Sequence, residues 1–153
     1  MTGPLNGLRV FDLTRILAGP TCTQILGDLG AEIIKIERPG SGDDTRKFGP
    51  PFLKDGAGRE TSEGGYFLGV NRNKRSLTLG LTQGEGQDLA RRLIAKCDIL
   101  VENFKIGGLS KYGLSYDKHK GGDRKSTRLN SSQKPNSYSV FCLKKKKSLH
   151  DSR

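Results

Sequence analysis

Residues 8–37 read LRVFDLTRILAGPTCTQILGDLGAEIIKIE and decide the fold. The apolar runs at 8–13 and 31–37 are typical of buried strands. Between them, residues 18–30 carry apolar side chains at helical spacing and end in Gly30, which predicts a helix. Two strands joined through one helix form a right-handed β-α-β unit, and such a unit requires a parallel sheet.

A second unit of the same kind follows after a long interruption. Residues 38–65 are rich in Gly, Pro and charge without periodicity, and a loop of this length is usually functional or disordered. Residues 75–81 predict a strand, and Thr82 with Glu85 predicts a capping box at the start of an amphipathic helix. Residues 98–104, DILVENF, predict the fourth strand. The pattern predicts an α/β fold whose amino-terminal portion is half of a Rossmann-like open parallel sheet.

The composition of the chain changes at about residue 118. The 153 residues have a formal net charge of +11, but residues 1–118 carry 17 basic and 14 acidic side chains, whereas residues 119–153 carry 10 and 2. Apolar periodicity stops at the same point. We therefore predict a folded portion, 1–118, and a disordered basic tail, 119–153, that does not pack on it.

The tail also resembles a translated sequencing-library adapter. Residues 123–132, DRKSTRLNSS, match one reading frame of the common adapter, and residues 137–143, SYSVFCL, differ from its continuation at one position. Four lysines follow, as poly-A would encode. Segments of artificial origin are excluded from fold reasoning. The alternative is a real tail in a basic nucleic-acid-binding protein, although the interleaved aromatic residues of single-strand binders are missing.

The residue types in the first 118 positions exclude several kinds of chemistry. Both histidines, His119 and His150, lie in the tail, so the folded portion offers no imidazole base and no His/Cys cluster, and we predict no metal site. No G-x-G-x-x-G follows the first strand, which disfavours a generic dinucleotide-binding domain. Three cysteines without paired spacing suit a reducing cytosol, and no apolar run has the length of a membrane span. We expect a cytoplasmic protein without a membrane or nucleic-acid partner.

Four segments occur together in the order and spacing of one known family. They resemble the start of class III CoA-transferases, which include formyl-CoA and carnitine CoA-transferases and α-methylacyl-CoA racemases. The resemblance rests on FDLTRILAGP (11–20), LGDLGAEIIKIERPGSGDDTR (26–46), NRNKRSL (71–77) and VENFKIGGLSKYGL (101–114). It implies that residues 1–118 are the CoA-binding portion of an interlocked homodimeric enzyme, whose substrates are an acyl-CoA and a carboxylic acid and which needs no separate cofactor.

The resemblance also implies a catalytic aspartate that forms mixed anhydrides and an aspartyl-CoA intermediate. In the family that aspartate lies beyond the position of residue 118. The aspartates Asp12, Asp28, Asp43 and Asp44 do not match its motif. We therefore assign no catalytic residue and expect the chain itself to be inactive.

Candidate CoA contacts are carried over from the family one position at a time. They are Leu17, Ala18, Arg38, Asn71, Arg72, Asn73, Lys74, Asn103, Phe104, Lys105 and Lys111. CoA carries a 3′-phosphate and a diphosphate, so its site requires cations and free backbone N–H groups at strand-to-helix turns. The residues alone permit simpler interpretations, since single cations could be solvated, Asn71 and Asn73 could form turns, and Phe104 could be core.

The same comparison bears on the substrate. Leu17 stands where members that use formyl-CoA have glutamine, so formate is not expected. Residues 40–46, residues 49–51 and NRNKRSL resemble transferases that use dicarboxylates such as succinate or glutarate. The alternative within the family is an α-methylacyl-CoA racemase, and Asn103 in VENF favours the transferase.

Overall fold

The computed structural model describes residues 3–105, 107–114, 125–130 and 139–144. Its strands are β1 (Arg9–Asp12), β2 (Glu32–Glu37), β3 (Phe52–Lys54), β4 (Glu60–Gly64), β5 (Lys74–Thr78), β6 (Ile99–Glu102), β7 (Lys125–Asn130) and β8 (Ser139–Lys144). Its helices are α1 (Ala18–Asp28), α2 (Gly65–Asn71) and α3 (Gly84–Ile94), with short 3-10 helices η1 (Asp44–Lys47) and η2 (Ser110–Tyr112). Each strand and helix of the two predicted β-α-β units is present.

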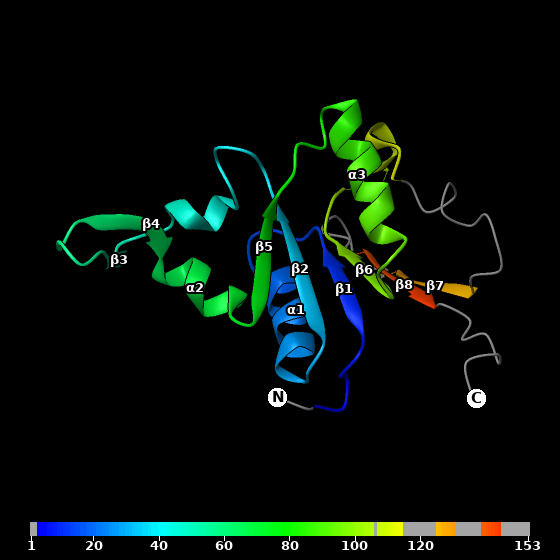
Figure 1. The fold of residues 1–153 in the computed structure, drawn as a ribbon, viewed down its shortest axis with the longest axis horizontal. Helices are drawn as coiled ribbons and strands as arrows, with labels where there is room; N and C mark the ends of the chain where they lie inside the picture. The colour runs from blue at the N-terminus through cyan, green and yellow to red at the C-terminus, as the bar shows by residue number, and fades with distance from the viewer. Residues whose placement is uncertain (1–2, 106, 115–124, 131–138, 145–153) are drawn as a thin grey trace.

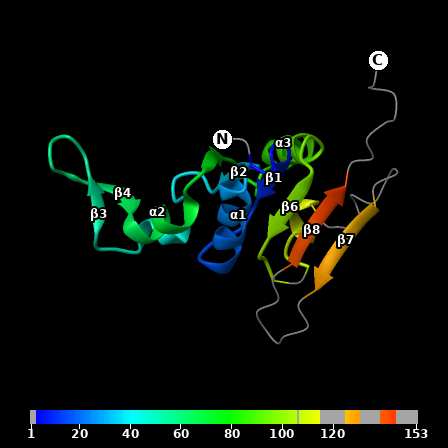
Figure 2. The same ribbon diagram turned by 90° about the horizontal axis from the view of Figure 1, so that it is seen from below.

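A mixed sheet forms the centre of the molecule. Its strand order is β5-β2-β1-β6-β8-β7, and β3 pairs with β4 in a separate hairpin. β1 lies parallel to both β2 and β6, and β2 lies parallel to β5. Figures 1 and 2 show α1 and α3 on opposite faces of these four strands. The predicted α/β fold with an open parallel sheet is confirmed.

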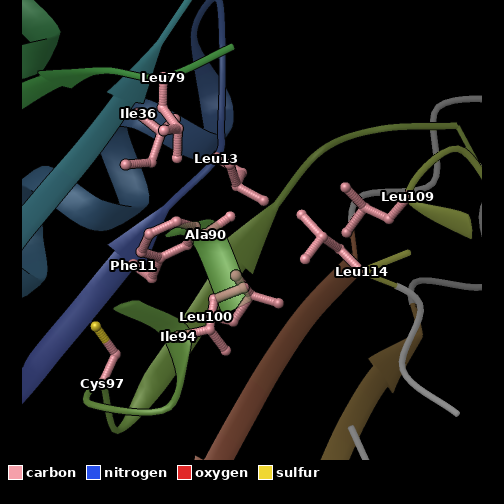
Figure 3. Close-up of a cluster of buried hydrophobic side chains, with 10 residues drawn as sticks. All are labelled: Phe11, Leu13, Ile36, Leu79, Ala90, Ile94, Cys97, Leu100, Leu109 and Leu114. Atoms are coloured by element: carbon pink, nitrogen blue, oxygen red, sulfur yellow. The ribbon is translucent and has the colours of Figure 1, made fainter. Parts of the chain in front are cut away.

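Side chains of β1 alternate between two apolar cores, as the period of a strand requires. Val10 belongs to the smaller core beneath α1, with Ala31, Ile33 and Val101, and Leu26 of α1 packs against it. Phe11 faces the other way into the larger core (Figure 3). That core consists of Phe11, Leu13, Ile36, Leu79, Ala90, Ile94, Cys97, Leu100, Leu109 and Leu114. The two cores fix α1 and α3 against the sheet, and with them the turns at its ends.

Residues 38–65 form defined structure rather than one long loop. They contain η1, β3 and β4 and lead into α2, and the hairpin points away from the sheet (Figure 1). One carboxylate oxygen of Asp55 accepts hydrogen bonds from the backbone N–H groups of Ala57 at 2.9 Å and Arg59 at 3.0 Å, which closes the hairpin turn. The strand ETSEG lacks apolar alternation, so the pattern could not predict it.

The capping box predicted at Thr82 is wrong. α3 begins at Gly84, and its cap residue Gln83 makes no side-chain cap hydrogen bond. Close backbone packing sets this turn, because a Cβ on Gly86 would lie only 1.9 Å from the carbonyl oxygen of Gly80. The predicted apolar stripe of the helix is present, with Ala90 and Ile94 buried.

Two segments of the tail continue the sheet, which differs from the prediction that the tail does not pack on it. β8 pairs antiparallel with β6, and β7 pairs antiparallel with β8. Without β8, the outer side of β6 would present unpaired N–H and C=O groups, and such groups pair readily with any extended segment. The expectation of disorder for the rest of residues 119–153 lies outside the described residues.

Candidate functional site

The parallel strands β1, β2, β5 and β6 all end on one side of the sheet, which we call its carboxyl end. Ligands of open α/β sheets bind outside this end. Three segments meet there: the turn from β1 to α1, the segment after β2, and the segment after β6. They contain six of the predicted contacts with CoA, which are Leu17, Ala18, Arg38, Asn103, Phe104 and Lys105.

The turn from β1 to α1 is held in an unusual conformation. Ile16 has a φ of 75°, in the left-handed region that a β-branched residue rarely adopts. The side chain of Asn103 holds the preceding residue from both sides. Its Oδ1 accepts from the Arg15 N–H at 3.0 Å, and its Nδ2 donates to the Arg15 carbonyl at 2.7 Å. Backbone strain of this kind concentrates at functional sites.

The start of α1 suits an anion. Leu17 is its cap residue and provides no side-chain hydrogen bond, and both Leu17 and Ala18 are exposed. The first turn of a helix leaves N–H groups without helical partners and carries a partial positive charge. Gly19 brings this turn close to β1, since a Cβ there would lie 2.5 Å from Cβ of Thr14. The exposed start of α1 therefore lies next to the end of β1, with Pro20 as the one residue of this turn that has no N–H.

A buried ion pair fixes the segment that follows β2. Lys35 Nζ lies 2.8 Å from Asp43 Oδ2, and each side chain is only 1% exposed. Lys35 also donates to the Thr14 carbonyl at 3.0 Å, and the other oxygen of Asp43 accepts from the N–H and hydroxyl of Thr45. Burial by itself raises the pKa of Asp43, but Lys35 and Thr45 outweigh burial and lower it. The pair thus links β2, the end of β1 and η1.

A second buried carboxylate, Glu37, anchors the same segment. Arg46 binds both of its oxygens, at 2.7 and 2.8 Å, and the Ser76 hydroxyl and the Asp43 N–H donate to it at 2.6 and 2.9 Å. The Arg46 guanidinium also lies 3.8 Å from the centre of the Phe67 ring in α2. Burial raises the pKa of Glu37, but these donors overcome it and lower the pKa from 4.5 to about 2.

The lowered pKa of Glu37 predicts acid destabilisation with a definite sign. Its contribution to stability is present above pH 4.5 and is lost as the pH falls toward 2, because the unfolded chain takes up the proton first. Between pH 4.5 and pH 2, we expect the unfolding free energy of Glu37→Gln to fall less than that of the unmodified chain. The difference should be on the order of 3 kcal/mol. Denaturant titrations from pH 6 to pH 2 measure it. Glu60→Gln, at an exposed carboxylate of β4, is the control, and an equal difference there would contradict the assignment.

Lys74 and Asn71 lie together, but beneath α1 and out of contact with solvent. The Lys74 ammonium donates to Asp12 at 3.2 Å, to the Pro20 carbonyl at 2.8 Å and to Asn71 Oδ1 at 2.9 Å. Its side chain is 2% exposed, and burial lowers the pKa of Lys74 to about 8 despite the opposing effect of Asp12. Asp12 also accepts from the Thr23 hydroxyl of α1 at 2.6 Å. These residues hold the first turns of α1 in place.

Arg72 and Asn73 lie at the opposite end of α1. Both bind Asp28, the last residue of the helix, through Arg72 Nη2 at 2.6 Å and Asn73 Nδ2 at 2.5 Å. β5 begins immediately after them, and a parallel strand begins at the amino end of the sheet. The structure therefore separates this pair from the predicted contacts at the carboxyl end.

Arg38, Phe104, Lys105 and Lys111 differ in exposure and in their contacts. Arg38 is half exposed and forms an ion pair with Asp44. Phe104 packs against the larger core and lies edge-on to Tyr112, with ring centres 6.1 Å apart. Lys105 is exposed, and Lys111 is exposed with its ammonium 4.8 Å from the Tyr112 ring centre.

Two kinds of feature are not found in the part of the chain that the structure describes. No group of three His, Cys, Asp or Glu side chains there is arranged to hold a metal ion. No helix among those residues is long and apolar enough to cross a membrane.

An open α/β layer with an anion-suited carboxyl end is the class of structure that the geometry defines. The chain belongs to the CoA-transferase family III, whose model matches residues 5–122. It is 52% identical over 114 residues to succinyl-CoA:glutarate CoA-transferase of Mus musculus, covering 74% of this chain and 24% of that protein. It is 49% identical over 114 residues to succinate–glutarate CoA-transferase of Agrobacterium fabrum, covering 74% and 28%.

A solved structure and a further relative extend this likeness. The chain superposes on a CAIB/BAIF family protein from Brucella suis with a TM-score of 0.71 and 51% identity, covering 78% of this chain and 31% of that one. It is 45% identical over 118 residues to formyl-CoA:oxalate CoA-transferase of Rhodopseudomonas palustris, covering 77% and 26%. The chain thus spans about a quarter of the length of the curated relatives it matches.

Proposed function

We propose that this chain is the CoA-binding portion of an enzyme that moves CoA between an acyl-CoA thioester and a carboxylic acid. The observation that carries the proposal is the uncapped, exposed start of α1, in a chain of this family. Arg15, just before this helix, and Arg38 both pair with Asp44. Helix N-termini and arginine side chains together bind phosphate groups. Leu17 and Ala18 offer backbone N–H groups, and Arg38, Lys105 and Lys111 offer cations.

Other residues of the predicted set support this site indirectly. Asn103 shapes the turn before α1 by binding the Arg15 backbone, while Lys74 and Asn71 fix the helix from below. We assign these three a positioning role. Phe104 forms part of the core wall on which Arg15 lies, and Arg72 with Asn73 secures the far end of α1.

We further propose that the catalytic aspartate is supplied by sequence outside residues 1–118. Its carboxylate would attack the thioester to give a mixed anhydride and CoA thiolate, which then attacks the aspartyl carbonyl and releases the acid. Asp12 and Asp43 are buried in ion pairs, Asp28 binds Arg72, and Asp44 lies between two arginines. A nucleophile needs an accessible carboxylate, which burial denies to Asp12 and Asp43, whereas the more exposed Asp28 and Asp44 are each paired with arginine.

A dicarboxylate is the substrate class we propose. Relatives named for succinyl-CoA and glutarate are about half identical to this chain, and Leu17 places an exposed apolar side chain beside the start of α1. The complete protein is proposed to be a homodimer. Exposed apolar side chains on α1 and α2 and at the end of α1, among them Ile25, Leu68 and Leu29, offer surface that a larger assembly would cover.

Titration of CoA into the chain tests the binding site. We expect Arg38→Ala to weaken CoA binding by about 1–3 kcal/mol, the scale for losing a charged hydrogen-bond partner. Isothermal calorimetry measures this change. Arg75→Ala is the matched control, because Arg75 is an exposed arginine of β5 that pairs with Glu32. An unchanged dissociation constant in Arg38→Ala would remove Arg38 from the site, and no CoA binding by the unmodified chain would contradict the proposal.

A further inference from the structure

Two arginines at the carboxyl end of the sheet share a single carboxylate. Arg15 Nη1 lies 3.4 Å from Asp44 Oδ2, and Arg38 Nη2 pairs with the other oxygen, Oδ1. The guanidinium groups come from different segments, one before α1 and one after β2. Arg38 also approaches the Gly42 carbonyl at 3.4 Å, which keeps it near the same turn.

A contribution to the stability of the fold does not explain why Arg15, Arg38 and Asp44 lie together. The side chains of Arg15, Arg38 and Asp44 are 38%, 49% and 41% exposed, and exposed ion pairs contribute little to stability. Two guanidinium groups on one carboxylate leave a net positive charge beside the start of α1, where the helix dipole adds to it. These three side chains are therefore better explained by the binding of an oxyanion than by a role in stability.

Arg15 is held in position by contacts that leave its guanidinium accessible. Asn103 binds its backbone on both sides, and the left-handed Ile16 follows it directly. Its guanidinium carbon lies 5.5 Å from the centre of the Phe104 ring, which restricts the side chain from one side. A guanidinium fixed in this way loses little freedom when an anion binds.

We propose that Arg15 and Arg38 form a two-arginine clamp for a substrate oxyanion, and that the carboxylate of Asp44 holds the position this oxyanion takes. The ligand chemistry is a phosphate of CoA or the free carboxylate of the acyl group. This identification rests on the proposed function. Arg15 is thus a binding residue, and Asp44 is an internal competitor that weakens binding while it keeps the two arginines together.

Inorganic pyrophosphate is the probe, because it carries the oxyanion without the rest of CoA. In calorimetric titrations of the full chain, we expect Arg15→Gln to weaken binding at least about tenfold and Asp44→Asn to tighten it about threefold to tenfold. Arg75→Gln and Asp88→Asn make the same charge changes at exposed ion pairs elsewhere, and both should leave the affinity within about twofold of the unmodified chain. Unchanged binding in Arg15→Gln, or weaker binding in Asp44→Asn, would overturn the clamp.

Parallel titrations with CoA, 3′-dephospho-CoA and glutarate identify the source of the oxyanion. Weaker CoA binding in Arg15→Gln with unchanged glutarate binding supports a phosphate, and a loss confined to 3′-phosphorylated CoA locates the 3′-phosphate. Weaker glutarate binding alone supports the carboxylate. If pyrophosphate follows the expected pattern but neither CoA nor glutarate binds the unmodified chain, the clamp stands and the proposed function fails.

Discussion

Replacing Asp43 with alanine is expected to lower the free energy of unfolding by about 3–5 kcal/mol, enough to unfold much of a marginal domain. The variant leaves the Lys35 ammonium buried, at 1% exposure, without its carboxylate partner. Lys35 then keeps its hydrogen bond to the Thr14 carbonyl. The variant also removes the side-chain cap of η1, since Asp43 accepts from the N–H of Thr45. Urea unfolding of the variant and the unmodified chain measures the difference.

The neighbouring residue provides a matched control. Asp44→Ala removes an exposed carboxylate one position further along and should change the unfolding free energy by less than about 1 kcal/mol. If Asp43→Ala does not fold, the double variant Lys35→Met with Asp43→Ala should recover most of the stability, because it removes the unpaired buried charge. Equal effects of Asp43→Ala and Asp44→Ala, or no recovery in the double variant, would contradict the role of the pair.

The centre of the sheet could be predicted from sequence because β1 and β2 carry apolar side chains on both faces. Val10 and Phe11 enter different cores, and Ile33 and Ile36 do the same in the neighbouring strand. A continuous apolar run is what a strand covered by helices on both sides requires. The hairpin of β3 and β4 has neither such a run nor an alternation of apolar residues. Polar contacts such as that of Arg59 with Asp55 close it, and these leave no periodic pattern in the sequence.

The candidate site was predicted in part. The turn residues Leu17, Ala18 and Asn103 lie at the carboxyl end as expected, because strand ends can be located from the sequence. The direction in which a side chain points cannot be inferred from the position of a strand end. Lys74 follows a turn and resembles a surface cation in the sequence, but its side chain runs under α1 to Asp12.

The buried charges escaped prediction for a related reason. Lys35 interrupts the apolar run AEIIKIE and would be assigned to a solvated face, yet it is buried because Asp43, eight positions away, folds back over it. Arg15 and Asp44 lie in two different segments of the family resemblance, and only the folded chain brings their side chains together. Spacing in the sequence gives no signal for such pairs, since each is formed by the path of a loop.

We propose that residues 1–118 bind CoA and that the catalytic aspartate lies elsewhere. CoA transfer by a complete enzyme that contains these residues tests this most directly. Residues 5–118 would replace the matching segment of the Agrobacterium fabrum relative, to which the chain is 49% identical. The assay measures transfer of CoA from succinyl-CoA to glutarate, by this chimera and by the 153-residue chain alone. We expect the chain alone to be at least about 10⁴-fold less active than the chimera, because loss of a covalent nucleophile leaves only binding and electrostatic assistance.

The chimera is expected to work within about tenfold of the relative, since the same α1 start and Arg38 would bind CoA next to an aspartate supplied by the remainder of the enzyme. That pair of results would support a CoA-binding portion whose catalytic group lies elsewhere. Transfer by a homogeneous preparation of the 153-residue chain, or a folded chimera that neither binds CoA nor transfers it, would contradict the account.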